Sequence, residues 1–406
     1  MNWRTRARDR GPRAPALLLL AGVLLVAANL RAVLTAVGPV LPEIGADRDM
    51  NPTELGLLVS LPILAFAVVS PVVHIVARRH GVERTVLIAL LVLLAGTLVR
   101  SVPIGFSLWL GTAVIGAGIA VSNVLLPVVV RQDFPDRVPS VTGYYIAAQS
   151  VVAGLASGLA VPLAAVTGSW EIAIGLWVLL IVFALGSWLP RLGRRGKPAE
   201  LPVPDEQVYA GAPVWRSGLA WQVATYFGLQ STAFYVLVNW LPTMEQDLGV
   251  SPAMAGWHLS VFLAGGIVAN LAAPLLLRLG ADQRIAAVST PTLTILAALG
   301  LMALPGLVAV WVALAGMAAG GSMVVALSLI TFRSGDAVAG SRLSSMVQSV
   351  GYLGVVLGLV VAGVIRDLAG PGNHLMLYVT VIAVLQLAVG LGVGRISMLA
   401  PARSPT

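Results

Sequence analysis

The sequence of 406 residues contains no cysteine, and only 10% of its residues are charged. The absence of cysteine excludes disulfide bonds, thiol catalysis and cysteine-ligated metal sites. The four histidines are scattered and lack the spacing of metal ligands, and neither a nucleophile elbow nor a phosphate-binding loop occurs. The sequence therefore predicts neither an enzyme nor a protein that holds a cofactor.

Hydrophobic residues make up 58% of the chain and its mean hydropathy is +0.92, which excludes a water-soluble domain of this length. Apolar runs of about 20 residues, enough to cross a hydrocarbon layer of ~30 Å, recur from end to end. The expected spans cover roughly 14–40, 54–77, 85–102, 107–130, 140–163, 171–190, 217–240, 254–277, 285–304, 307–331, 343–365 and 375–394. The pattern predicts an all-α polytopic membrane protein with twelve transmembrane helices, whose first run is too long for the core of a secretory signal.

The basic residues lie almost entirely on one side of these spans. If the N-terminus is cytoplasmic, only Arg48, Arg100 and Arg366 fall in connections on the outer side. Because cytoplasmic loops are enriched in Lys and Arg, we expect a bacterial inner-membrane protein with both termini in the cytoplasm. Orientation in the lipid bilayer then explains the net charge of +8 without a nucleic-acid partner.

One long polar segment divides the expected spans six and six. This division predicts an N-terminal six-helix bundle at 1–190, a cytoplasmic linker at 191–216 and a C-terminal six-helix bundle at 217–406. The halves also match at an offset of about 200 residues, as Gly56 with Gly256 and Pro52 with Pro252 illustrate. Parallel repeats of six spans are typical of major facilitator transporters, in which the solute site lies between the halves near mid-membrane.

Acidic residues are missing from the middle of every expected span, whereas one basic residue, Arg31, lies well inside the first. Burying a charge in hydrocarbon is costly, so such a residue is a candidate for function. The guanidinium is a planar donor fork that suits a small anion or a nitro or carboxylate group. The alternative is that Arg31 caps backbone carbonyls of a neighbouring helix.

Polar and aromatic side chains spaced four residues apart suggest walls for a cavity around Arg31, because such residues share one helix face. The candidates are Tyr226, Gln230 and Phe234 in the seventh span, Tyr145 and Gln149 in the fifth, and Gln348 and Tyr352 in the eleventh. These side chains could instead hold helices together by hydrogen bonds.

Four further polar residues are candidates for which a structural role is favoured. Asn123 and Asn270 are possible ligand contacts, and His258 and His74 are possible proton-carrying or gating groups. Asparagine often joins membrane helices by hydrogen bonds, and a histidine at such an interface can be purely structural.

Several strings make the sequence similar to the cyanate and 2-nitroimidazole transporter family of the major facilitator superfamily. They are Asn29-Leu30-Arg31, Leu41-Pro42-Glu43-Ile44, Asn123-Val124-Leu125-Leu126-Pro127, Phe227-Gly228-Leu229-Gln230-Ser231 and Asn239-Trp240-Leu241-Pro242. The resemblance implies a monomeric secondary transporter of a small polar or anionic solute, whether cyanate-like, nitroimidazole-like or another small organic anion. A broad-specificity exporter of amphipathic compounds is the alternative, although such exporters tend to have buried acids and large aromatic cavities, and aromatic residues here are only 6%.

Overall fold

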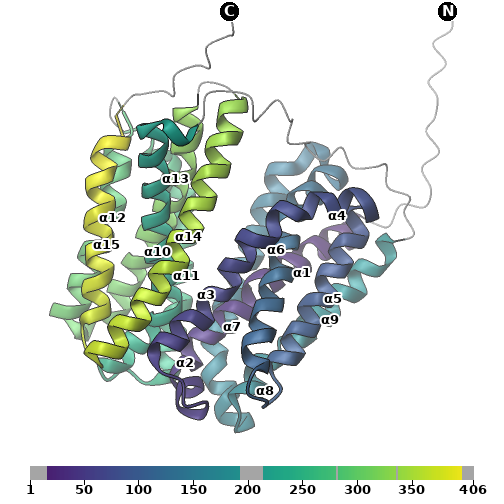
Figure 1. Ribbon diagram of the computed structural model, residues 1–406, viewed down its shortest axis with the longest axis horizontal. Coiled ribbons are helices and arrows are strands. Elements are labelled where there is room, and N and C mark those ends of the chain that lie inside the picture. The colour runs from purple at the N-terminus through teal and green to yellow at the C-terminus, as the bar shows by residue number, and fades with distance from the viewer. Residues whose placement is uncertain (1–15, 193–213, 280–281, 335–336, 396–406) are drawn as a thin grey trace, which may run out of the picture.

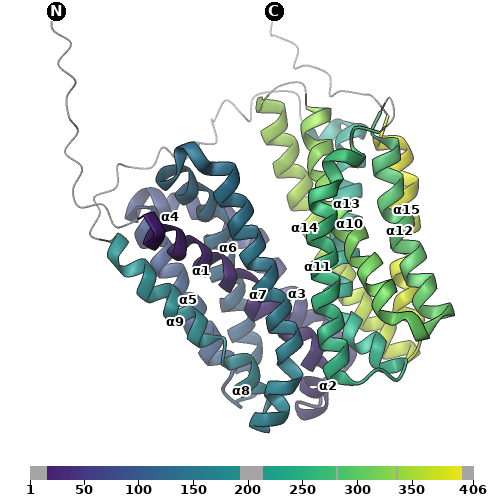
Figure 2. The same ribbon diagram turned by 180° about the vertical axis from the view of Figure 1, so that it is seen from behind.

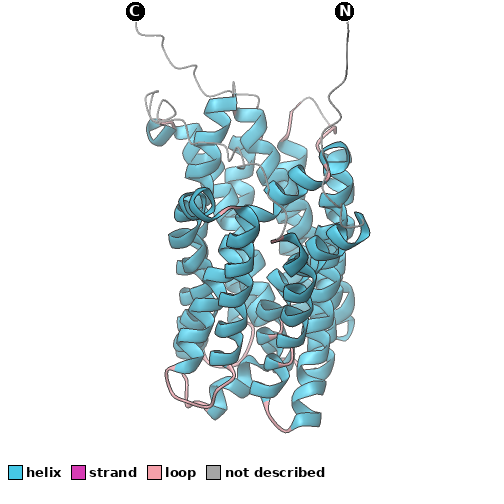
Figure 3. Cartoon of the chain, turned by 90° about the vertical axis from the view of Figure 1, so that its right-hand side faces the viewer, coloured by secondary structure: helices cyan, strands magenta, loops and turns pink. Residues whose placement is uncertain are grey.

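The computed structural model describes residues 16–192, 214–279, 282–334 and 337–395, and in these ranges it contains helices and no strand. The all-α architecture expected from the sequence is confirmed. Figure 3 shows long helices running roughly side by side, as expected where every backbone polar group must be satisfied within its own segment.

Several short breaks divide the spans of the first half into separate helices. They are α1 (Ala16–Thr35), α2 (Val37–Asp47), α3 (Pro52–Val69), η1 (Ser70–Val72), α4 (Val73–His80), α5 (Val82–Arg100), α6 (Ser107–Asp133), η2 (Pro135–Arg137), α7 (Val138–Thr167), α8 (Trp170–Gly175), α9 (Val178–Trp188) and η3 (Leu189–Arg191).

The second half has longer and less interrupted helices. They are η5 (Val214–Arg216), α10 (Gly218–Asp247), α11 (Pro252–Leu276), α12 (Arg284–Ala303), η6 (Pro305–Leu307), α13 (Val308–Arg333), α14 (Ala337–Ala369) and α15 (His374–Val393).

Eleven segments of the described chain are long and apolar enough to cross a membrane. The helix α10 is not among them although it has 30 residues, because polar side chains such as Gln222, Gln230 and Asn239 interrupt its apolar sequence. With α10 as the remaining span, these segments correspond to the twelve expected spans.

The first expected span is broken and longer than the sequence indicated. It consists of α1 and α2, which are separated at Ala36, and it continues to Asp47 rather than ending near Val40. Pro39 has no N–H to donate to the carbonyl of Thr35, so the regular helix cannot continue through this point. The break leaves carbonyl groups at the end of α1 free for side-chain partners.

The helices form two groups, α1–α9 and α10–α15, which stand beside each other in Figures 1 and 2. The groups lie apart at the end where α1 begins and α15 ends, which we call the open end. At the opposite end, the closed end, α2 and α3 reach across to the second group. The contacts between the groups join α3 with α14, α7 with α11, and α2 with α10.

Small residues and short hydrogen bonds make the closed end tight. A Cβ on Gly56 would lie 2.6 Å from the carbonyl oxygen of Leu359, and one on Gly256 would lie 2.8 Å from that of Ser157. The hydroxyl of Ser260 donates to the carbonyl of Gly154 at 2.6 Å. Gly56 and Gly256 are equivalent in the internal repeat, and each allows close backbone approach to the other half.

Candidate functional site

Arg31 lies four residues before the end of α1, near the middle of the span that α1 and α2 form together, and is half-buried between the two groups of helices. It lines three adjoining cavities. The central cavity, of about 170 Å³, lies against α7, α10, α11, α13 and α14. The open-end cavity, of about 360 Å³, is bordered by α3, α6 and α14. The third extends from Arg31 toward the closed end, between helices of the first half and α10 of the second.

The guanidinium of Arg31 has no ion-pair partner in the described part of the chain, and donates no hydrogen bond there. Its Cζ lies over the ring of Phe234, 5.6 Å from the ring centroid. Cation–π attraction positions the guanidinium and leaves its N–H groups available. Arg31 is therefore a positive charge that faces open volume.

The face of α10 expected from the sequence meets Arg31 through Gln230 and Phe234, both of which line the central cavity. The amide nitrogen of Gln230 lies 2.6 Å from Ser231 Oγ and 3.2 Å from Met323 Sδ. These contacts hold the amide at the cavity wall. Asn270 of α11 lines the same cavity.

Of the two symmetric pairs, the one on α14 lines the cavities with both residues, and the one on α7 lines them with Gln149 alone. Gln149 and Tyr352 line both the central and the open-end cavity, and Gln348 and Asn123 line the open-end cavity. The ring of Tyr352 lies edge-on to those of Phe66 and Phe227, with centroids 6.5 and 5.9 Å apart. Tyr352 thus links the two halves beside Arg31.

Three of the proposed residues do not line any of the three cavities around Arg31. Tyr226 is fully buried, and its hydroxyl donates to the carbonyl of Ala287 at 3.0 Å within the second half. Tyr145 packs against the apolar core of the first half. His258 lies toward the closed end, where Nδ1 is 2.5 Å from the carboxylate of Glu245. His74 belongs to α4, and its side chain is outside the described residues.

Two buried charges differ from the placement that the sequence indicated. Glu245, expected in an external connection, belongs to α10 and is 0% exposed. Arg100, also expected in an external connection, is 1% exposed at the end of α5. Both lie near helix ends, where a sequence alone indicates access to water, and packing of the neighbouring helices covers them. Glu245 still lies well away from the middle of its helix.

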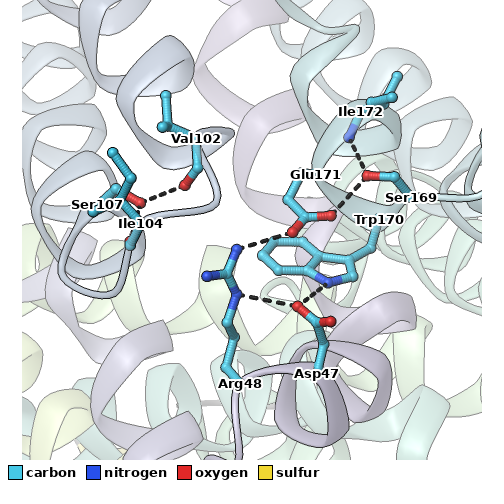
Figure 4. A network of polar contacts seen from close by, with 9 residues as sticks. All are labelled: Asp47, Arg48, Val102, Ile104, Ser107, Ser169, Trp170, Glu171 and Ile172. Carbon is cyan, nitrogen blue, oxygen red and sulfur yellow. Dashed lines mark hydrogen bonds and ion pairs between the residues drawn. The ribbon is translucent and has the colours of Figure 1, made fainter.

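Other acids at the closed end form peripheral contacts. Figure 4 shows Arg48 between Asp47 and Glu171, with nitrogen–oxygen distances of 3.1 and 2.9 Å. The indole nitrogen of Trp170 donates to Asp47 at 3.3 Å, which ties α8 to α2. These acids therefore hold the first half together at this end.

Sequence analysis assigned no role to several residues at the centre. Tyr235 lines all three cavities, and Ser231 and Met323 line the central one. The spacing of Ser231, Tyr235 and Asn239 on α10 was a usable signal, because it repeats the four-residue interval that identified the neighbouring face. Met323 gave no such signal, since methionine is a common filler of apolar interiors.

The known proteins that this chain resembles are transporters. Residues 19–359 match the family model described as Major Facilitator Superfamily. The chain is 36% identical over 379 residues to a 2-nitroimidazole transporter of Escherichia coli (strain K12), covering 93% of this chain and 96% of the relative. It is 26% identical over 360 residues to the cyanate transport protein CynX of the same organism, covering 88% and 92% respectively.

A solved structure has the same fold. It is a bacterial homologue of the human lysosomal transporter Spinster in an inward-facing and unoccupied conformation, with a TM-score of 0.77 at 15% identity. The alignment covers 96% of this chain and 100% of that one.

Proposed function

The chain belongs to the Major Facilitator Superfamily, and from that premise we propose that it is a secondary transporter of a small polar or anionic solute, anchored by Arg31. The family and its relatives are transporters, so the protein is a multi-pass membrane transporter and not an enzyme. The finer proposal concerns the solute and the residue that binds it.

The observation that carries the proposal is the unpaired guanidinium of Arg31 in the cavity between the halves. A charge in the membrane interior without a partner is costly, and among the described residues no carboxylate lines the central cavity or the open-end cavity to compensate for it. An anionic or nitro-bearing solute would supply the missing acceptors. The planar fork favours a group with two oxygen or nitrogen acceptors.

The remaining walls suit a small solute. The amide groups of Gln149, Gln230 and Asn270 offer both donors and acceptors, and the rings of Phe234 and Tyr352 offer flat apolar surface. A central cavity of about 170 Å³ has room for a compact molecule rather than a large amphipathic drug. The names of the relatives, which refer to 2-nitroimidazole and cyanate, agree with this size.

We propose that the structure represents one state of an alternating-access cycle. The groups of helices lie apart at the open end, and the interface of α3 with α14 and α7 with α11 seals the other. Transport requires rocking of one half against the other around a central site, as in other transporters built from repeats. Arg31 lies on this path because it lines cavities directed toward both ends.

The domain organisation and orientation proposed from the sequence follow the same scheme. The bundles would be 1–190 and 217–406 with 191–216 as a cytoplasmic linker, and the open end would then face the cytoplasm, where we expect both termini. The N-cap of α10 at Ser217 agrees with a helix that begins directly after the linker. A reporter enzyme that works only in the cytoplasm should be active when it is inserted after Glu206. Activity at this position of a reporter that works only on the outer side would refute the orientation.

The test of the anchor is a binding measurement on purified protein. A thermal-shift screen of small anions and nitroheterocycles would identify a ligand, since a ligand at 100 times its dissociation constant adds about 2.7 kcal/mol to the stability of the folded state. Arg31→Ala should abolish the shift and the uptake into proteoliposomes, and Arg31→Lys should transport poorly because it loses the fork.

Arg48→Ala is the matched control, because it removes an arginine that is paired with Glu171 away from the cavities. It should keep the ligand-induced shift. Wild-type affinity in a well-folded Arg31→Ala protein would show that Arg31 is not the anchor. Stabilisation by amphipathic compounds, with none by small anions, would favour the exporter alternative.

A further inference from the structure

A second arginine, Arg100, lines the cavity that extends from Arg31 toward the closed end. Arg100 is in the last turn of α5, and its side chain is 1% exposed. The Nη1 atom donates to the carbonyl of Val33 at 2.8 Å. This carbonyl belongs to the last turn of α1, where intrahelical donors are missing, so one part of the guanidinium caps the broken helix.

The rest of the Arg100 guanidinium has no partner. Its Nε and Nη2 atoms are buried and make no hydrogen bond to any described residue. A helix cap needs one donor, whereas arginine carries five N–H groups in a fixed plane. Leaving charged donors unsatisfied in an apolar interior is unfavourable, so the remaining donors indicate a ligand or ordered water.

Arg100 lines the cavity that extends from Arg31 toward the closed end, which we call the Arg100 cavity. Its volume is about 40 Å³, room for about three water-sized groups in contact. In the described part of the chain no Asp or Glu lines it, and most of the wall is aliphatic, as at Leu58, Val59 and Ile63. The cavity is thus a small apolar space with an arginine on its wall toward the closed end and another on the side of the central cavity.

Local packing holds Arg100 in this position. A Cβ on Gly111 of α6 would lie 2.4 Å from the backbone nitrogen of Arg100 and 2.6 Å from its Cα. Only glycine lets α6 approach α5 so closely at this point. The arginine is therefore held against the cavity by the backbone of two helices, rather than by a flexible connection at the membrane surface.

We propose that the Arg100 cavity is a second binding site for a small monovalent anion of about three heavy atoms, on the closed-end side of the central cavity, with Arg31 on the wall that the two share. The free N–H groups of Arg100 are the donors, and the aliphatic walls exclude larger or strongly hydrated ions. In the transport cycle this site is the position of the anion between Arg31 and the solution at the closed end. That placement rests on the proposed function, whereas the binding itself does not.

The test uses radiolabelled thiocyanate, a linear anion of three heavy atoms, and the full-length protein in lipid nanodiscs. Binding is measured in an Arg31→Ala background, so that the central site does not contribute. The Arg31→Ala protein should keep saturable thiocyanate binding, and adding Arg100→Met should abolish it. Arg48→Met in the same background removes a half-buried arginine of the same end that lines none of the three cavities, and it should leave binding unchanged.

A second variant guards against misfolding after loss of the bond from Arg100 to Val33. Val59→Phe keeps Arg100 in place and fills the cavity with a larger side chain, so it should also abolish the residual binding. Arg31→Ala protein that binds no thiocyanate would overturn the inference and leave the anchor role of Arg31 intact. Residual binding that survives both Arg100→Met and Val59→Phe would likewise overturn it. The Arg31→Ala protein could instead bind thiocyanate with full wild-type affinity and lose this binding when Arg100→Met is added. That result would refute the anchor role of Arg31 and support this site.

Discussion

Replacement of Gly363 by alanine should shift the protein away from the conformation described here. Gly363 lies in α14 at the closed end, and a Cβ at this position would lie 2.4 Å from the carbonyl oxygen of Pro52, which belongs to the other half. An ordinary contact begins near 3.4 Å, so the two halves must separate locally by about 1 Å. The neighbouring atom is backbone and has no alternative rotamer.

The magnitude follows from the cost of overpacking, which is about 1–3 kcal/mol for an inserted methyl group. The clash exists only where the two halves touch, so this cost applies to the closed arrangement and not to one in which that end has opened. A difference of 1–3 kcal/mol changes an equilibrium by about 5- to 150-fold. The population with this end open should rise by that factor.

The absence of cysteine from the chain makes the shift directly measurable. Thr243, near the end of α10, is 7% exposed, so Thr243→Cys introduces a single reporter thiol that is covered in the closed arrangement. With Gly363→Ala, the thiol should react faster with a membrane-impermeant maleimide, in proportion to the open population. Gly354→Ala is the matched control, because it lies in the same helix and no atom comes within 4 Å of its added Cβ. Equal labelling rates in the two variants would refute the reasoning.

Two other substitutions test the placement of residues within the second half. His258→Ala leaves the fully buried carboxyl group of Glu245 without its hydrogen-bond partner and should lower the free energy of unfolding by about 1–3 kcal/mol, measured by thermal denaturation in detergent; the double variant with Glu245→Gln should not lose more than the single variant. Tyr226→Phe should cost about 0.5–1.5 kcal/mol through loss of the bond to Ala287, yet keep wild-type substrate affinity, because Tyr226 does not line the cavities around Arg31; a loss of affinity at unchanged stability would show that the cavity extends to it.

The sequence was sufficient for the features that depend on composition and one-dimensional order. Long apolar segments must span lipid and must be helical there, so the number and approximate position of the spans followed from hydropathy. Arg31 was recognisable because no surface lies within reach of a side chain in the middle of a span. Gln230 and Phe234 were recognisable because the helical period places them on one face.

Only the tertiary structure decided which helix face meets the cavity and which meets another helix. Tyr226 shares the four-residue spacing of Gln230 and Phe234, yet it lies one turn nearer the start of α10, where α12 covers it. Periodicity defines a face but not the point along the helix at which the two halves separate.

The same reason explains the two buried charges near helix ends. Arg100 and Glu245 occupy positions from which a side chain normally reaches water, and the sequence contains nothing that distinguishes them from Arg48 or Asp47. Arg100 is buried because α1 breaks at Ala36 and Gly111 brings α6 against α5, and these approaches exist only after the helices have packed. Contacts between distant segments therefore determined both the second arginine cavity and the partner of Glu245, whereas local sequence determined the spans that made those contacts possible.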